Sequence, residues 1–154
     1  MPVSVRATLR GARLRVAAVE AVMRRLLALV GRSAEEVHVL LAGDRLMRRL
    51  NGRYRRRDYP TDVLAFPPSP QTCPPISLLG DVVVCLPQAI RQARAAGHSV
   101  DAELTALLIH GLLHLCGYDH ERGAVEARRM QRKEQALMQA MGPIPNLTTR
   151  RGRA

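Results

Sequence analysis

The sequence of 154 residues is poor in aromatic side chains: it has no tryptophan, three tyrosines and one phenylalanine. So small a set disfavours a platform on which successive bases stack, as in many proteins that bind single-stranded nucleic acid. Long apolar runs are also missing, and stretches such as Val82–Leu86 and Leu104–Ile109 are too short to cross a bilayer. No membrane partner is therefore expected.

Cysteines are few, and the three that occur have no C-x-x-C spacing, which predicts neither a disulfide framework nor a thiolate metal site. No secretory signal is recognisable, because charged residues interrupt the apolar ones at the N-terminus. The first 32 residues are rich in arginine and nearly free of acids, a composition typical of an organelle transit peptide. However, Val3–Thr8 alternates like a strand and Leu14–Val30 has the pattern of an amphipathic helix. We therefore expect a folded N-terminus and a cytoplasmic protein.

Acidic residues are scarce as well, with 13 Asp and Glu against 24 Lys and Arg, so the net charge is +11. Lys133 is the only lysine, and arginine supplies the rest of the positive charge. The planar guanidinium group donates two parallel hydrogen bonds to a phosphate. This excess favours polyanionic partners, and with so few aromatic residues a nucleic acid would be bound mainly through its backbone.

The length and the hydrophobic pattern predict a single α+β domain, in which a small mixed β-sheet of about four strands packs with about five helices. The domain covers residues 1–142. Residues 143–154 form a basic tail without periodicity, which we expect to be disordered. A proline-rich stretch, Pro67–Leu79, is expected to be an irregular loop. The predicted strands are Val3–Thr8, Glu36–Leu41, Val63–Phe66 and Asp81–Leu86. The predicted helices are Gly11–Val30, Asp44–Asn51 with Asp44 as its N-cap, Pro87–Ala96, one capped by Ser99 or Asp101 that carries two histidines, and Gly123–Met141.

A metal site is indicated by the segment HGLLHLCGYDH, which holds three of the five histidines. His110 and His114 are four residues apart, so on a helix they lie about 40° from each other and can bind one ion. His120 would leave that face if the helix continued. Gly117 allows the backbone to end the helix in the left-handed conformation and to reverse. Three neutral imidazoles leave one open position on a tetrahedral ion, which is typical of a catalytic zinc site.

The spacing matches the metalloprotease pattern H-E-x-x-H-x-x-G-x-x-H, except that Gly111 stands where those enzymes have their general base. Loss of such a base removes a factor of about 10²–10⁴ in rate, so peptide cleavage is disfavoured. We further expect that Gly111→Glu keeps its zinc and places a negative charge beside the metal. Asp119 is either a partner of a metal-binding histidine or a candidate general base, and Thr61 and Asp62 are expected to fix a turn.

A second cluster is the segment NGRYRRRDYPTDVLAFP, in which Arg53, Arg55, Arg56 and Arg57 are basic. Most of these side chains are expected to be solvated. One of them reaching the metal could hold a phosphate and stabilise the charge that develops on it. The residues alone do not show which arginine this is.

Together with LGDVVVC at Leu79–Cys85, these segments resemble the YbeY family of endoribonucleases, and the resemblance runs from about Val3 to Gly142. It implies a zinc-dependent ribonuclease in ribosomal RNA maturation, notably at the 3′ end of the small-subunit RNA, and in ribosome quality control. Its RNA and small-subunit partners would include ribosomal proteins. It assigns one Zn²⁺ per chain to His110, His114 and His120, and the catalytic role to Arg55. The chain departs from the family at Ala65, where serine is common, and in its run of arginines.

Two other functions stay open at this stage. One is a metallohydrolase with a different substrate, such as a peptide. The other is a ribosome-associated assembly factor that binds RNA and whose metal only stabilises the fold. The sequence does not predict the oligomeric state.

Overall fold

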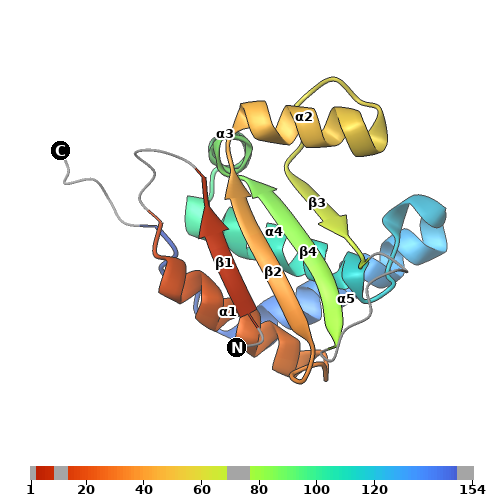
Figure 1. Cartoon of the computed structure of the whole chain (residues 1–154). Helices are drawn as coiled ribbons and strands as arrows, with labels where there is room; N and C mark the ends of the chain where they lie inside the picture. The colour runs from red at the N-terminus through yellow and green to blue at the C-terminus, as the bar shows by residue number, and fades with distance from the viewer. Residues whose placement is uncertain (1–2, 9–13, 69–76, 149–154) are drawn as a thin grey trace.

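A four-stranded mixed sheet forms the centre of the computed structural model, which describes residues 3–8, 14–68 and 77–148 (Figure 1). The strand order is β1-β2-β4-β3. β1, β2 and β4 are parallel, whereas β3 pairs with β4 in the antiparallel direction. The strands are β1 (Val3–Ala7), β2 (Glu36–Ala42), β3 (Val63–Phe66) and β4 (Leu78–Cys85). The helices are α1 (Val16–Leu29), α2 (Asp44–Arg55), α3 (Leu86–Ala96), α4 (Val100–Leu115) and α5 (Ala124–Met141), with a 3-10 turn, η1, at His120–Arg122.

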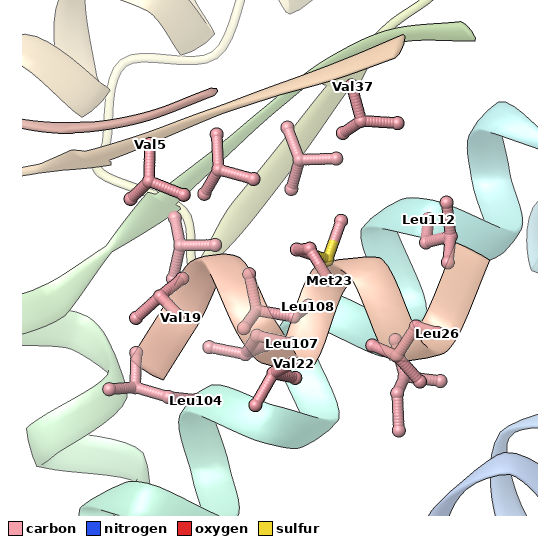
Figure 2. Packing of buried hydrophobic residues seen from close by; sticks show 14 of the residues in the cluster. Val5, Val19, Val22, Met23, Leu26, Val37, Leu104, Leu107, Leu108 and Leu112 are labelled. Carbon is pink, nitrogen blue, oxygen red and sulfur yellow. The ribbon is translucent and has the colours of Figure 1, made fainter. Parts of the chain in front are cut away.

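The two faces of the sheet carry cores of unequal size. On one face, valines such as Val5 and Val37 pack against α1 and α4, and α5 closes this core on the outside (Figure 2). On the other face α2 is the helix that covers the strands within the described residues, and Met47 packs there with Leu64 and Val83. Because successive strand residues point to opposite faces, β4 contributes to both cores.

The helix α4 lies inside the larger core. It is apolar along most of its length, as expected for a helix surrounded by other elements. Its start agrees with one of the two predicted caps: the Ser99 hydroxyl accepts a hydrogen bond from the Ala102 amide at 3.0 Å. The acidic side chains in its first turn also favour a helix N-terminus. The helix therefore presents its last two turns, which carry His110 and His114, at one end of the sheet.

The predicted architecture is confirmed, and several boundaries change. α2 continues four residues beyond the predicted end at Asn51. Its N-cap is Gly43 rather than Asp44, whose carboxylate pairs instead with Arg91 of α3 at 2.7 Å. β4 begins at Leu78, inside the predicted loop, because pairing with β2 extends it. Residues 69–76 of that loop and the predicted helix start at residues 11–13 lie outside the described residues. None of the described helices is long and apolar enough to span a membrane.

The prediction of a disordered tail is wrong for residues 143–148. Leu147 is fully buried in the larger core. The Asp101 carboxylate accepts hydrogen bonds from the Leu147 amide, the Thr148 amide and the Thr148 hydroxyl, at 2.9–3.0 Å. Asp101 thus anchors the segment after α5 and is not the cap of α4. The rest of the tail, residues 149–154, lies outside the described part of the chain.

Candidate metal centre

The three predicted histidines come together at the C-terminal end of α4. One ring nitrogen of each lies within 4.8 Å of one nitrogen of each of the others. The ring centroids of His110, His114 and His120 are 4.8–5.1 Å apart in pairs. The closest approach is 3.2 Å, between Nε2 of His114 and Nδ1 of His120. Three imidazoles that converge on one point fit a first-row metal ion such as zinc.

The chain reversal that brings in His120 depends on Gly117. Its φ of 101° lies in the region that favours glycine, and the helix ends just before it at Leu115. The Tyr118 amide then donates to the Leu113 carbonyl at 3.0 Å, which closes the turn. The predicted reversal is therefore confirmed, with the intervening segment only two residues long.

Asp119 stabilises the turn that carries His120. Its carboxylate accepts a hydrogen bond from the Glu121 amide at 2.9 Å, and this bond is the main reason why the pKa of Asp119 is lowered. Its other charged contact is with Arg122 at 3.5 Å. Among the described residues its hydrogen bonds and ion pairs go to these partners and not to a histidine, so the structure does not support Asp119 as a histidine partner.

Glu134 of α5, rather than Asp119, is the carboxylate partner of a histidine in this cluster, His110. Its carboxylate is hydrogen-bonded to Nδ1 of the His110 ring. A carboxylate on one ring nitrogen fixes the orientation and tautomer of a histidine and leaves the other nitrogen, here Nε2, for a metal. No local pattern indicates this pair, because the two residues are 24 positions apart and on different helices.

The surroundings also favour the neutral form of His114. Burial lowers the pKa of this residue, and repulsion from His110 and His120 lowers it further. A metal binds the neutral imidazole and competes with protons for it. His114 is thus ready to bind a metal at neutral pH. The remaining histidines lie apart from this cluster: His38 contacts Glu36 and Asp81, and His98 contacts Glu103.

A polar cavity of about 340 Å³ opens over the three histidines. Arg55, in the last turn of α2, lines it and pairs with Glu121 through distances of 3.2 and 3.3 Å. Arg57 lines it too, and donates to the Tyr59 hydroxyl at 3.3 Å. The cavity is lined by Asn51, Arg55, Arg57, Thr61, Asp62, Val63, Ala65, His110, Gly111, His114, His120 and Glu121. Two arginines of the basic cluster therefore face the metal centre, and Arg53 and Arg56 do not line it.

The floor of the cavity is held by the segment between α2 and β3. The Asp62 carboxylate accepts hydrogen bonds from the Val63 amide at 2.8 Å and from the Thr61 hydroxyl at 3.4 Å, as expected for residues that fix a turn. Asn51, which the sequence analysis missed, is 1% exposed and donates from its side chain to the Tyr59 carbonyl at 2.8 Å. This bond ties the basic segment to α2. The side-chain oxygen of Asn51 is buried without a partner among the described residues.

Gly111 has a packing role that its place in the protease pattern did not reveal. A β-carbon at this position would lie 2.7 Å from Cγ1 of Val82 and 3.2 Å from Cγ2 of Val63. The backbone of α4 at Gly111 therefore lies directly against β3 and β4, and the absence of a side chain allows this close approach. The expectation that Gly111→Glu would keep its metal is not compatible with this contact, because a glutamate would push α4 away from β4.

Comparison with known proteins identifies relatives of this chain. Residues 9–142 match the family described as Endoribonuclease YbeY. A protein of that name from Anaeromyxobacter sp. (strain Fw109-5) is 53% identical over 120 residues, which is 77% of this chain and 60% of the relative. Another, from Aquifex aeolicus (strain VF5), is 40% identical over 112 residues, which is 73% of this chain and 74% of that one.

Among solved structures, the solution structure of TM1509 from Thermotoga maritima is similar, with a TM-score of 0.59 and 27% identity over 89% of this chain and 87% of that one. The chain spans 60% of the length of each of the two Anaeromyxobacter relatives that it matches. The matched residues include β2, β3, β4 and the three histidines, and leave out β1. The chain therefore belongs to the YbeY family.

Proposed function

We propose that this protein is a zinc-dependent endoribonuclease that acts in ribosomal RNA maturation, notably at the 3′ end of the small-subunit RNA, and in ribosome quality control. The observation that carries the proposal is the convergence of three imidazoles opposite a pair of arginines in one polar cavity. Such a site suits an anionic ester better than a peptide. The names of the relatives and the net charge of +11 support an RNA substrate.

The ligands that we assign to one Zn²⁺ per chain are His110, His114 and His120, with Glu134 holding His110. The set of donors fits zinc, which accepts neutral imidazoles in a tetrahedral arrangement and keeps one position for water or substrate. Zinc, when bound, supplies Lewis acidity toward a phosphoryl oxygen or an attacking water.

Arg55 is the residue that we assign to the phosphate. Its side chain is 38% exposed, and its guanidinium pairs with the Glu121 carboxylate. A phosphate that enters the cavity would replace this carboxylate, whose two oxygens both accept from Nη2 of Arg55. In hydrolysis, an oxygen of water bonds to phosphorus while the bond from phosphorus to the leaving ribose oxygen breaks, and one proton passes, net, from the water to that ribose oxygen. Arg55 would stabilise the negative charge that gathers on the phosphoryl oxygens during this step.

Zinc content and RNA cleavage, measured on the same preparations, test this proposal. The wild-type protein should contain about one zinc per chain and cleave a fragment of small-subunit precursor RNA. His114→Ala should lose most of both, whereas His98→Ala, a histidine outside the cluster, should lose neither. Stoichiometric zinc with unchanged affinity in His114→Ala would overturn the metal assignment. In cells, depletion of the protein should leave ribosomal RNA with unprocessed ends.

The two alternatives differ from the proposal in measurable ways. An assembly factor that only binds RNA and has a structural metal would not cleave RNA itself. Any cleavage seen with it would be lost on purification or would persist in His114→Ala. A metallohydrolase of another class would cleave a generic peptide or a small phosphate ester and leave RNA intact. We propose the cytoplasm as the location and the small ribosomal subunit, with its proteins, as the partner.

A further inference from the structure

The outer side of α2 and the turn after it carry an unusual density of arginine. Between Asp44 and Asp58 there are seven arginines and only two acidic residues. Three of the seven have polar partners: Arg48 pairs with Asp58, Arg55 with Glu121, and Arg57 donates to a tyrosine hydroxyl. The other four are exposed and, within the described part of the chain, have no carboxylate at ion-pair distance. We call these four the α2 basic face: Arg45, Arg49, Arg53 and Arg56.

The α2 basic face forms a row along the helix. Arg45, Arg49 and Arg53 follow one another at intervals of four residues, so each lies about 40° and about 6 Å from the next. Arg56 continues the row beyond the last turn. Arg55 and Arg57, on either side of Arg56 in the sequence, line the cavity over the histidines, so the last turn of α2 lies beside the metal centre. Around the helix, Arg53 is about 160° from Arg55, so Arg56 lies in sequence between the row and the cavity. Figure 1 shows the start of α2 near α3. The Arg55–Glu121 ion pair ties the other end of α2 to η1.

The backbone conformation of Arg56 is a separate observation that favours a functional role for its side chain. It is the C-cap of α2, with φ 57° and ψ 37°, and is the only non-glycine with positive φ among the described residues. Glycine is the usual residue at such a position, because other L-residues are strained there. A strained residue that persists suggests a function for the side chain, and this one adds a free cation between the row and the cavity.

We propose that the α2 basic face binds the backbone of single-stranded RNA on one side of the phosphate held in the cavity. The inference rests on the proposed function for the cleavage site and adds the path of the strand. A single row of cations suits one strand, because a duplex offers two rows of phosphates. Tyr54 is 56% exposed, but the Arg53 guanidinium stacks over its ring at 5.4 Å. Contacts along the row would therefore be with phosphates and independent of base sequence.

The test measures RNA binding without cleavage. Affinity for a short single-stranded RNA is measured in the presence of a chelator over a range of salt concentrations. Each phosphate contact contributes about 0.7 to the slope of log affinity against log salt for single strands. The triple variant R45Q/R49Q/R53Q should therefore have a slope shallower by about 2. Glutamine is a good helix former, so α2 should persist, and circular dichroism checks this.

The matched control removes the same charge elsewhere. R94Q/R128Q/R132Q changes three exposed arginines of α3 and α5 that also lack a carboxylate partner among the described residues. It should keep the wild-type slope. Equal losses of slope in the two triple variants would show that net charge alone attracts RNA and would overturn the proposal. An unchanged slope in the α2 variant, or a loss seen only with duplex RNA, would also overturn it.

Arg56→Gly separates binding from folding. Glycine relieves the strained backbone, so the thermal midpoint should stay the same or rise, while the salt slope becomes shallower by about 0.7. A purely structural Arg56 would leave the slope unchanged and thereby contradict its place in the row. Cleavage is followed separately with zinc-loaded wild-type protein. If that protein cuts no RNA but the slopes behave as expected, the proposed function fails and the RNA-binding face stands.

Discussion

Adding one methyl group at Gly111 should separate α4 from the sheet and loosen the metal centre. In Gly111→Ala the new β-carbon would lie 2.7 Å from Cγ1 of Val82, a side chain with no exposed surface. Valine is stiff at its first side-chain torsion, so either Val82 leaves its rotamer or the helix moves. Overpacking of this kind costs about 1–3 kcal/mol of the free energy of unfolding. The higher helix propensity of alanine returns about 1 kcal/mol.

The net expectation for Gly111→Ala is a loss of about 1 kcal/mol, which lowers the melting temperature by about 2–4 °C in a protein of this size. Gly52→Ala in α2 is the matched control, because its nearest heavy atom would be the Arg57 carbonyl oxygen at 3.6 Å, an ordinary contact. That variant should gain about 1 kcal/mol, the helix-propensity difference alone.

The contact with Val82 can be isolated with a double-mutant cycle. Val82→Ala removes the two methyl groups that meet the new β-carbon, so Gly111→Ala should cost less in that background than in the wild type. Neighbouring residues of this kind couple by about 0.5–3 kcal/mol. Thermal and denaturant unfolding give the free energies, and zinc titration reports whether His110 and His114 stay in place. A Gly111→Ala protein as stable as Gly52→Ala, or an additive cycle, would refute the reasoning. Gly111→Glu should lose fold and zinc together.

Four further results are expected. Glu134→Ala should weaken zinc binding by about 10–100-fold in a competition titration, and Glu134→Gln, which keeps a hydrogen-bond acceptor, should recover part of it; equal affinity in all three proteins would remove Glu134 from the site. Arg55→Ala should lose most RNA cleavage and keep its zinc content and melting temperature, whereas parallel loss of zinc would make Arg55 a structural residue. The pKa of His114 is lowered in the folded protein, so the unfolded chain takes up a proton first as the pH falls below about 6.5, and the metal-free protein should lose stability there. Urea unfolding at several pH values measures this free energy. A stability that rises on acidification would contradict the expectation. Leu147→Ala should cost about 2–5 kcal/mol of the free energy of unfolding, and a change near zero would show that residues 143–148 do not belong to the core.

Local periodicity determined most of the fold. The alternation along β1 (Val3–Ala7) and the four-residue spacing of His110 and His114 depend only on backbone geometry, so the sequence predicted the strand and the convergence of these two histidines. Gly117 was also predictable, because a helix that ends in a left-handed residue is a local event. Composition and spacing did not show which of four arginines would bind the phosphate, and the resemblance to a family assigned this role to Arg55.

The tertiary structure decided what depends on contacts between distant segments. Glu134 meets His110 only because α5 packs along α4, and no local pattern links residues 24 positions apart. Leu147 enters the core because Asp101 binds the segment that holds it, although that segment has no periodicity of its own. Gly111 had been interpreted through the chemistry of proteases, yet the close approach of α4 to Val82 accounts for it. Helix and strand geometry repeats within a few residues, whereas packing and side-chain pairing are fixed only when the chain folds back on itself.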